Sequence, residues 1–130
     1  MKILAGISIL VVEDDDALRE SIVEMFDYAG AKVFNVDNGK DALDMVSTQS
    51  FDIVFSDVRM GKGDGITLMK QLALRPGPKP LCFLCTGHAD ISEPEALQMG
   101  VLKVFAKPFK PAHIFEELQK SIDLNLKKSG

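Results

Sequence analysis

The chain is organised around Ile53-Val54-Phe55-Ser56-Asp57-Val58-Arg59-Met60, a largely apolar run that leads into a carboxylate. Residues 53–55 are expected to form a strand buried on both faces, and the glycine-rich segment 61–65 predicts an irregular loop after it. Strands of this kind belong to parallel sheets covered by helices on both sides. Because open α/β sheets place their chemistry beyond the carboxyl ends of the strands, Asp57 is the first candidate for a functional residue.

The same alternation of a buried strand and an amphipathic helix recurs five times along the 130 residues. The strands are predicted at residues 7–12, 32–36, 51–57 and 81–86, with a fifth inside the segment 101–106. A helix is predicted after each strand: from residue 17 to a stop at Gly30, from about Ala42 beyond an Asn38-Gly39 turn, from Ile66 to about Leu72, from a capping box at Ser92 to about Met99, and from Pro111 onward. Right-handed crossovers between successive strands then predict one parallel sheet with helices on both faces.

Composition and charge restrict the class of protein. Hydrophobic residues make up 46% of the chain, and no apolar run approaches the roughly 20 residues that span a bilayer. The net charge of −4 argues against direct binding to nucleic acid, and the first residues do not form a secretory signal. We therefore expect a single cytoplasmic domain over residues 1–130, without an output domain, a membrane segment or a nucleic-acid site.

Two cysteines, Cys82 and Cys85, have the C-x-x-C spacing of redox and metal sites. Both lie in the predicted strand 81–86, where residues three apart point to opposite faces and their Cα atoms are roughly 10 Å apart. That separation is too long for a disulfide, and the sequence offers no second cysteine pair or nearby histidine couple for zinc. The interpretation favoured here is two buried thiols that pack as small apolar residues.

The carboxyl ends of the predicted strands lie along one edge of the sheet, and this edge collects five polar residues: Glu13, Asp14, Asp57, Thr86 and Lys107. Three carboxylates in one place repel one another by about 1–4 kcal/mol for each pair at contact distance. A lysine supplies part of the balancing charge and a hard divalent ion the rest, so Mg²⁺ is expected, with Mn²⁺ as a substitute. Singly, each residue could instead be a helix cap, a solvated turn or a surface charge, but their common location favours a site.

In this order and spacing, these residues resemble the phosphoacceptor receiver domain of two-component response regulators. The resemblance also includes Asp64-Gly65 before the third helix, Gly87 after Thr86, and Lys107-Pro108-Phe109, and it extends over nearly the whole chain. It implies a flavodoxin-like α/β fold, with a single doubly wound five-stranded parallel sheet in the order 2-1-3-4-5 and five helices.

The resemblance implies a role for each of these residues. Asp57 would take a phosphoryl group from a histidine kinase or a histidine phosphotransfer protein, and Lys107 would neutralise charge on the phosphoryl oxygens. The Mg²⁺ ligands that it implies are Glu13, Asp14, Asp57 and the backbone carbonyl of Arg59. Thr86 would donate its hydroxyl to the phosphoryl group and, by moving, change the surface. The chain would catalyse its own phosphorylation and slow autodephosphorylation without being a turnover enzyme.

The chain departs from the family pattern three residues before Lys107, where receivers carry an aromatic side chain and this sequence has Val104. Phe105 is adjacent, but a one-residue step along a strand reverses the face, so Phe105 is not expected to substitute. Coupling to the surface of the fourth helix, fifth strand and fifth helix is therefore expected to differ. Arg59 and His88 flank the implied phosphoryl site, and we expect them to set the lifetime of the aspartyl phosphate, unless both point into solvent.

Three functions remain open at this point. The first is a signalling switch phosphorylated on Asp57, which acts on a downstream protein or on an output domain absent from this sequence; the resemblance also leaves open a homodimer through the fourth and fifth helices. The second is a phosphorylation-independent protein-interaction module, favoured mildly by Val104 and opposed by the intact site. The third is a Mg²⁺-dependent phosphatase, but such enzymes place a second acid two residues after the nucleophile, where this chain has Arg59.

Overall fold

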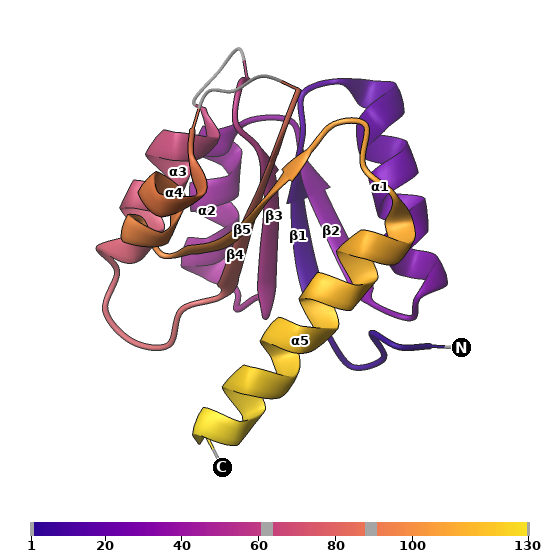
Figure 1. The fold of residues 1–130 in the computed structure, drawn as a ribbon. Helices are drawn as coiled ribbons and strands as arrows, with labels where there is room; N and C mark the ends of the chain where they lie inside the picture. Colours follow the sequence, from indigo (N-terminus) through magenta and orange to yellow (C-terminus); the bar gives the residue numbers. More distant parts are fainter. Residues whose placement is uncertain (1, 61–63, 88–90, 130) are drawn as a thin grey trace.

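A computed structural model of the chain describes residues 2–60, 64–87 and 91–129. Its strands are β1 Ser8–Val12, β2 Lys32–Val36, β3 Ile53–Asp57, β4 Leu81–Thr86 and β5 Val101–Ala106. Its helices are α1 Asp16–Tyr28, α2 Gly39–Thr48, α3 Gly65–Ala73, α4 Glu93–Gln98 and α5 Pro111–Ser129. Neighbouring strands are parallel, and the order across the sheet is β2-β1-β3-β4-β5 (Figure 1), which confirms the predicted fold and strand order.

Helices cover both faces of the sheet, with α1 and α5 on one face and α2, α3 and α4 on the other (Figure 1). Ile53 and Phe55 of β3 pack in the core beneath α1 and α5, whereas Val54 packs in the core beneath α2, α3 and α4. All five residues of β3 are buried, and successive strand residues point to opposite faces, so this strand needs cover on both sides. Within the described ranges, none of the helices combines the length and the apolar character that crossing a bilayer requires.

Side-chain caps define where the helices begin. Asp15 and Asp64 each accept a hydrogen bond from the backbone N–H three residues later, at 2.9 and 2.7 Å. Asn38 does the same at 2.8 Å, so the predicted turn Asn38-Gly39 is instead the cap and first residue of α2. The predicted capping box at Ser92 is present. A cap satisfies a backbone donor that has no partner within the helix, which explains why α1, α2, α3 and α4 each start directly after a polar residue.

Two strands begin later than predicted. The predicted strands started at Ile7 and Phe51, but the observed ones start at Ser8 and Ile53. The carboxylate of Asp52 accepts hydrogen bonds from the backbone N–H (2.8 Å) and from the hydroxyl (3.1 Å) of Ser8. Asp52 therefore joins the amino ends of β1 and β3 through its side chain instead of extending the strand.

One extra residue in β5 shifts its register against β4. Two consecutive residues of β4 lie opposite Val101 and Lys103, so Leu102 is inserted as a β-bulge. Beyond the bulge, Phe105 packs in the core beneath α1 and α5, whereas Val104 packs against the core on the other face. The two side chains face opposite sides of the sheet, as expected from their adjacency, so Phe105 does not occupy the position that Val104 leaves without an aromatic ring.

The two cysteines are free thiols on opposite faces of β4. Cys82 belongs to the core beneath α2, α3 and α4, and Cys85 belongs to the core beneath α1 and α5. Burial raises the pKa of Cys82 to about 12, and burial also raises the pKa of Cys85 above its ordinary value. This arrangement confirms the prediction of two separate buried thiols, which stay protonated near neutral pH.

Candidate functional site

Four strands bring polar residues to the edge of the sheet that lies at the top of Figure 1. Glu13 follows β1, Asp57 and Thr86 are the last residues of β3 and β4, and Lys107 follows β5. The Lys107 Nζ atom lies 3.1 Å from Glu13 Oε1 and 3.2 Å from Asp57 Oδ2. One ammonium group therefore bridges two carboxylates that the sequence had predicted at the same edge.

The two carboxylates are largely removed from water, since Glu13 is 1% exposed and Asp57 is 7% exposed. Burial raises the pKa of Glu13; hydrogen bonds from the Asp15 N–H and from Lys107 oppose this effect, and the charge of Asp57 adds to it. Burial alone would lower the pKa of Lys107, but the carboxylates of Glu13 and Asp57 raise it, so the group remains an ammonium ion. Two buried carboxylates sharing one ammonium group leave an excess of negative charge, which suits a bound cation.

Backbone contacts hold the Asp57 carboxylate in place. The Val58 N–H donates to Asp57 Oδ1 at 2.8 Å, while Oδ2 faces Lys107. Gly65, the first residue of α3, donates its N–H to the Val58 carbonyl at 2.8 Å, and a Cβ on Gly65 would overlap the Asp57 carbonyl oxygen. Only glycine fits this close approach, so the Asp64-Gly65 pair has a steric role that sequence reasoning did not identify.

The predicted residues Asp14 and Arg59 lie outside this buried group. Both are exposed, and together with Met60 and Asp64 they line an open depression at the same edge of the sheet. The structure therefore separates the predicted site into a buried part, which contains the bridged carboxylates, and a solvent-exposed rim.

The three remaining residues predicted for the site are Thr86, Val104 and His88. Thr86 is 7% exposed, and its backbone carbonyl accepts a hydrogen bond from the Lys107 N–H at 2.8 Å, which joins the carboxyl ends of β4 and β5. Val104 is partly buried against the core beneath α2, α3 and α4. His88 lies outside the described residues.

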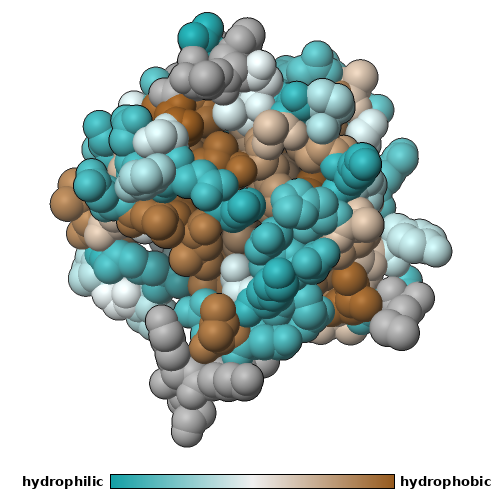
Figure 2. Space-filling view, viewed as in Figure 1, coloured by the Kyte–Doolittle hydropathy of each residue, from teal (hydrophilic) through white to brown (hydrophobic). Residues whose placement is uncertain are grey.

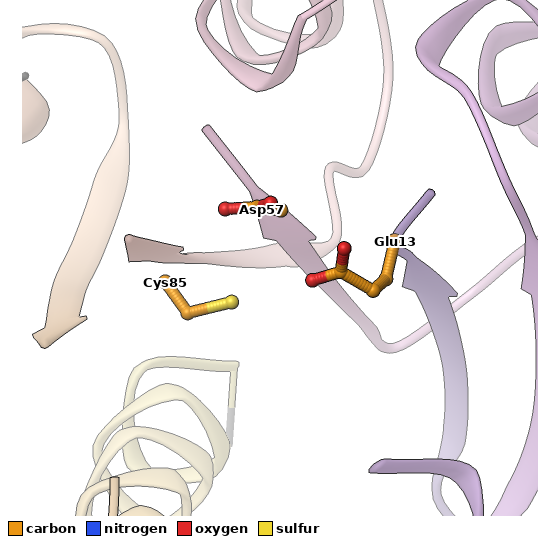
Figure 3. A group of neighbouring side chains, drawn as sticks. All are labelled: Glu13, Asp57 and Cys85. Atoms are coloured by element: carbon orange, nitrogen blue, oxygen red, sulfur yellow. The ribbon is translucent and has the colours of Figure 1, made fainter. Parts of the chain in front are cut away.

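Sequence reasoning missed one neighbour of the acids. Cys85 lies opposite Asp57 in the β3–β4 pairing, and its Sγ atom belongs with carboxylate oxygens of Glu13 and Asp57 to a group whose ligand atoms all lie within 4.8 Å of one another (Figure 3). The alternation of side chains along β4 predicts that this cysteine is in the core, but it does not indicate which residue of β3 lies opposite. Only the register against β3 could have revealed it.

The donor atoms at this edge fit a hard divalent ion. Glu13 and Asp57 offer buried carboxylate oxygens with too little positive charge around them, and Asp14 offers a further carboxylate at the rim. Mg²⁺ takes oxygen ligands and keeps several of its waters, which an open rim allows.

Comparison with known proteins relates the chain to a family. Residues 9–119 match the family model of the response regulator receiver domain. The transcriptional regulatory protein FixJ of Bradyrhizobium diazoefficiens is 35% identical over 115 residues, which are 88% of this chain and 56% of FixJ, so the chain spans little more than half of that relative. Sporulation initiation phosphotransferase F of Bacillus subtilis is 30% identical over 117 residues, which cover 89% of this chain and 94% of that protein.

Solved structures give the same relationship. The receiver domain of the sensor histidine kinase PA1611 from Pseudomonas aeruginosa PAO1, described with a magnesium ion coordinated in its active site cleft, is 29% identical with a TM-score of 0.79. The similarity covers 89% of this chain and 97% of that domain. From its parallel sheet, the acids at the carboxyl edge and these matches, the chain belongs to the response regulator receiver domain family.

Proposed function

We propose that the chain is a signalling switch that accepts a phosphoryl group on Asp57 from a histidine kinase or a histidine phosphotransfer protein. The observation that carries this proposal is the contact between the Asp57 carboxylate and Lys107, beside the buried Glu13 carboxylate. An acid at the end of a central strand, paired with an ammonium group, combines a nucleophile with a counter-charge for the transferred group.

In the transfer itself, a carboxylate oxygen of Asp57 forms a bond to phosphorus. The bond between phosphorus and the donor's histidine nitrogen breaks, and the electron pair leaves with that nitrogen. The Lys107 ammonium group would turn from the carboxylates toward the phosphoryl oxygens and stabilise their charge, which supplies most of what this reaction requires. The Asp57 side chain is already oriented by the Val58 N–H, so little ordering is left to the encounter with the donor.

The residues that would hold Mg²⁺ are Glu13, Asp14, Asp57 and the backbone carbonyl of Arg59. Mg²⁺, when bound, supplies positive charge that neutralises the carboxylates and the phosphoryl oxygens. Mn²⁺ would serve as a substitute because it accepts the same oxygen ligands.

Thr86 would convert the new charge into a change of surface. Its hydroxyl would donate to a phosphoryl oxygen, and its movement would displace the segment that follows β4. The adjacent surface contains exposed Leu97 of α4 and Leu102 of β5, and Figure 2 shows apolar side chains gathered in this region beside the more polar surface of α5. A downstream protein, an output domain or a second copy of the chain would bind this surface, with Val104 in place of the aromatic residue usual in the family.

Arg59 and His88 would set the lifetime of the aspartyl phosphate by hindering the attacking water. Arg59 lies at the exposed rim beside Asp14 and Asp64, which is close to where the phosphoryl group would project. Replacing each residue by alanine is expected to change the rate at which the phosphorylated protein loses its added mass. Equal rates in both variants and in the unaltered protein would contradict this role.

The test of the proposed function is incubation with acetyl phosphate and Mg²⁺ followed by intact-mass measurement. We expect the unaltered protein to gain the mass of one phosphoryl group. No gain is expected for Asp57→Asn, or for the unaltered protein when the metal is chelated before acetyl phosphate is added. Asp52→Asn is the matched control, because Asp52 is exposed and precedes the same strand at its opposite end, and this variant should still be labelled.

Two other outcomes would favour other functions. A folded protein that gains no mass would support the phosphorylation-independent interaction module, which the absence of an aromatic residue at Val104 favours. Continued release of phosphate over many turnovers would instead support a phosphatase.

A further inference from the structure

The thiol of Cys85 is a buried polar group without a hydrogen-bond partner among the described residues. The residue is 0% exposed, and no donor or acceptor of the described chain lies in hydrogen-bonding geometry with its Sγ atom. The other cysteine differs, because the Cys82 thiol donates to the Pro80 carbonyl at 3.5 Å. Burial therefore leaves the Cys85 sulfur atom as an unused ligand.

This sulfur atom points toward the buried acids (Figure 3). Its position follows from the sheet register, in which Cys85 lies directly opposite Asp57. The Cys85 Sγ atom and one carboxylate oxygen each of Glu13 and Asp57 all lie within 4.8 Å of one another. All three residues are buried, which distinguishes this group from the acidic clusters common on protein surfaces.

We propose that Glu13, Asp57 and Cys85 form a site for a thiophilic divalent cation of the zinc type, in addition to the magnesium chemistry of the same edge. Such ions take thiolate and carboxylate ligands in tetrahedral geometry, and a site with three protein ligands leaves the fourth position to water. Bond lengths of about 2.0–2.3 Å place the ligand atoms of such an ion roughly 3.3–3.8 Å apart. The ligand atoms now lie within 4.8 Å of one another, so binding of the ion would require the three side chains to move closer together.

The charge balance of the site permits the divalent ion to replace the ammonium group of Lys107. Lys107 contacts Glu13 Oε1 and Asp57 Oδ2, and its side chain is 23% exposed, so it can swing toward solvent and open a path for the ion. As the ion binds, the S–H bond of Cys85 breaks, a metal–sulfur bond forms, and the proton passes to solvent. A doubly charged ion and a thiolate replace a singly charged ammonium and a neutral thiol, so the net charge of the group is unchanged.

Binding of such an ion has a consequence for phosphoryl transfer. Because Lys107 would leave Asp57, the ion would hold the site in an inactive form. This consequence rests on the proposed function, whereas binding of the ion does not. The experiment therefore measures ion binding alone, and a negative result would leave the outcome of the phosphorylation test unchanged.

The experiment titrates metal-free protein with Cd²⁺, a spectroscopically visible thiophilic ion, under a non-chelating reductant. Coordination is read from the ultraviolet charge-transfer absorption between thiolate and cadmium. Three proteins are compared: the unaltered chain, Cys85→Ala, and Cys82→Ala as the matched control, since Cys82 is also a free, buried thiol but lies on the far face of β4. The circular dichroism of each protein verifies its fold, and Cys85→Ser replaces the alanine variant if that variant does not fold.

We expect a saturable absorption in the unaltered chain and in Cys82→Ala, and its loss in Cys85→Ala together with at least about tenfold weaker Cd²⁺ binding. Mg²⁺ binding, followed by calorimetry, should be equal in the three proteins because it uses oxygen ligands alone. Absence of the absorption in the unaltered chain, its persistence without the Cys85 thiol, or its loss in Cys82→Ala would each overturn the proposal.

Discussion

Replacing Lys107 by methionine should destabilise the fold, because it removes the ammonium group and keeps most of the alkyl chain. The contacts at 3.1 Å to Glu13 and 3.2 Å to Asp57 each correspond to about 5 kcal/mol of attraction at an effective dielectric constant near 20. Burial of the charged groups offsets most of this attraction. Removing one partner of a buried ion pair costs about 3–5 kcal/mol, and we expect about 3 kcal/mol because the lysine side chain remains 23% exposed.

The loss of stability should grow with pH. Burial already raises the pKa of Glu13 above its ordinary value of 4.5, and removing Lys107 removes a contact that lowers it. The folded variant then holds the Glu13 proton more tightly than the unfolded chain does. Its free energy of unfolding therefore falls as the pH rises from 4.5 through the raised folded-state pKa. The loss relative to the unaltered protein should be smaller at about pH 5 than at about pH 8.

Urea denaturation in metal-free buffer measures both effects. Lys103→Met is the matched control, because Lys103 lies on β5, the strand that directly precedes Lys107. Its Nζ atom is 3.2 Å from Glu93 Oε1, but the Glu93 side chain is 60% exposed. An exposed pair of this kind contributes only about 0–1 kcal/mol. Adding Mg²⁺ should restore part of the stability of Lys107→Met. Equal losses in the two variants, or a loss for Lys107→Met that does not change with pH, would refute the reasoning.

Three further substitutions test the packing around the site by the same denaturation assay. Gly65→Ala should cost about 1–3 kcal/mol, because its Cβ would meet the Asp57 carbonyl oxygen, and an unchanged stability would mean that this approach is not as close as described. Phe105→Ala should cost about 3–5 kcal/mol, because Phe105 is 2% exposed and packs against other aromatic rings. A loss of stability smaller than that of Ser92→Ala, described next, would argue against this packing. Ser92→Ala should cost about 1 kcal/mol by removing the capping box of α4, without altering labelling of Asp57.

Local pattern was enough to predict much of the fold. The strands Lys32–Val36 and Leu81–Thr86 have the bounds expected from their apolar runs, and the fifth strand fills the segment 101–106 that was expected to contain it. The capping box at Ser92 opens α4 as its residues indicate. These features depend on residues close together in the chain, where the period of the apolar side chains and the polar caps act directly. The error at Asn38 is also local, since its side chain caps α2 instead of forming a turn. The later start of β3 is not local, because Asp52 binds Ser8, 44 residues away in the sequence.

The sequence by itself determined which polar residues follow the strands and so reach one edge of the sheet. The tertiary structure decided how they meet: that Lys107, 94 residues after Glu13, bridges two buried carboxylates, and that Asp14 and Arg59 stay at the rim. It also placed Cys85 opposite Asp57 and inserted a bulge in β5. The physical reason is that pairing register joins strands distant in sequence. A shift of one residue exchanges the side chains on each face, and no short segment records that choice.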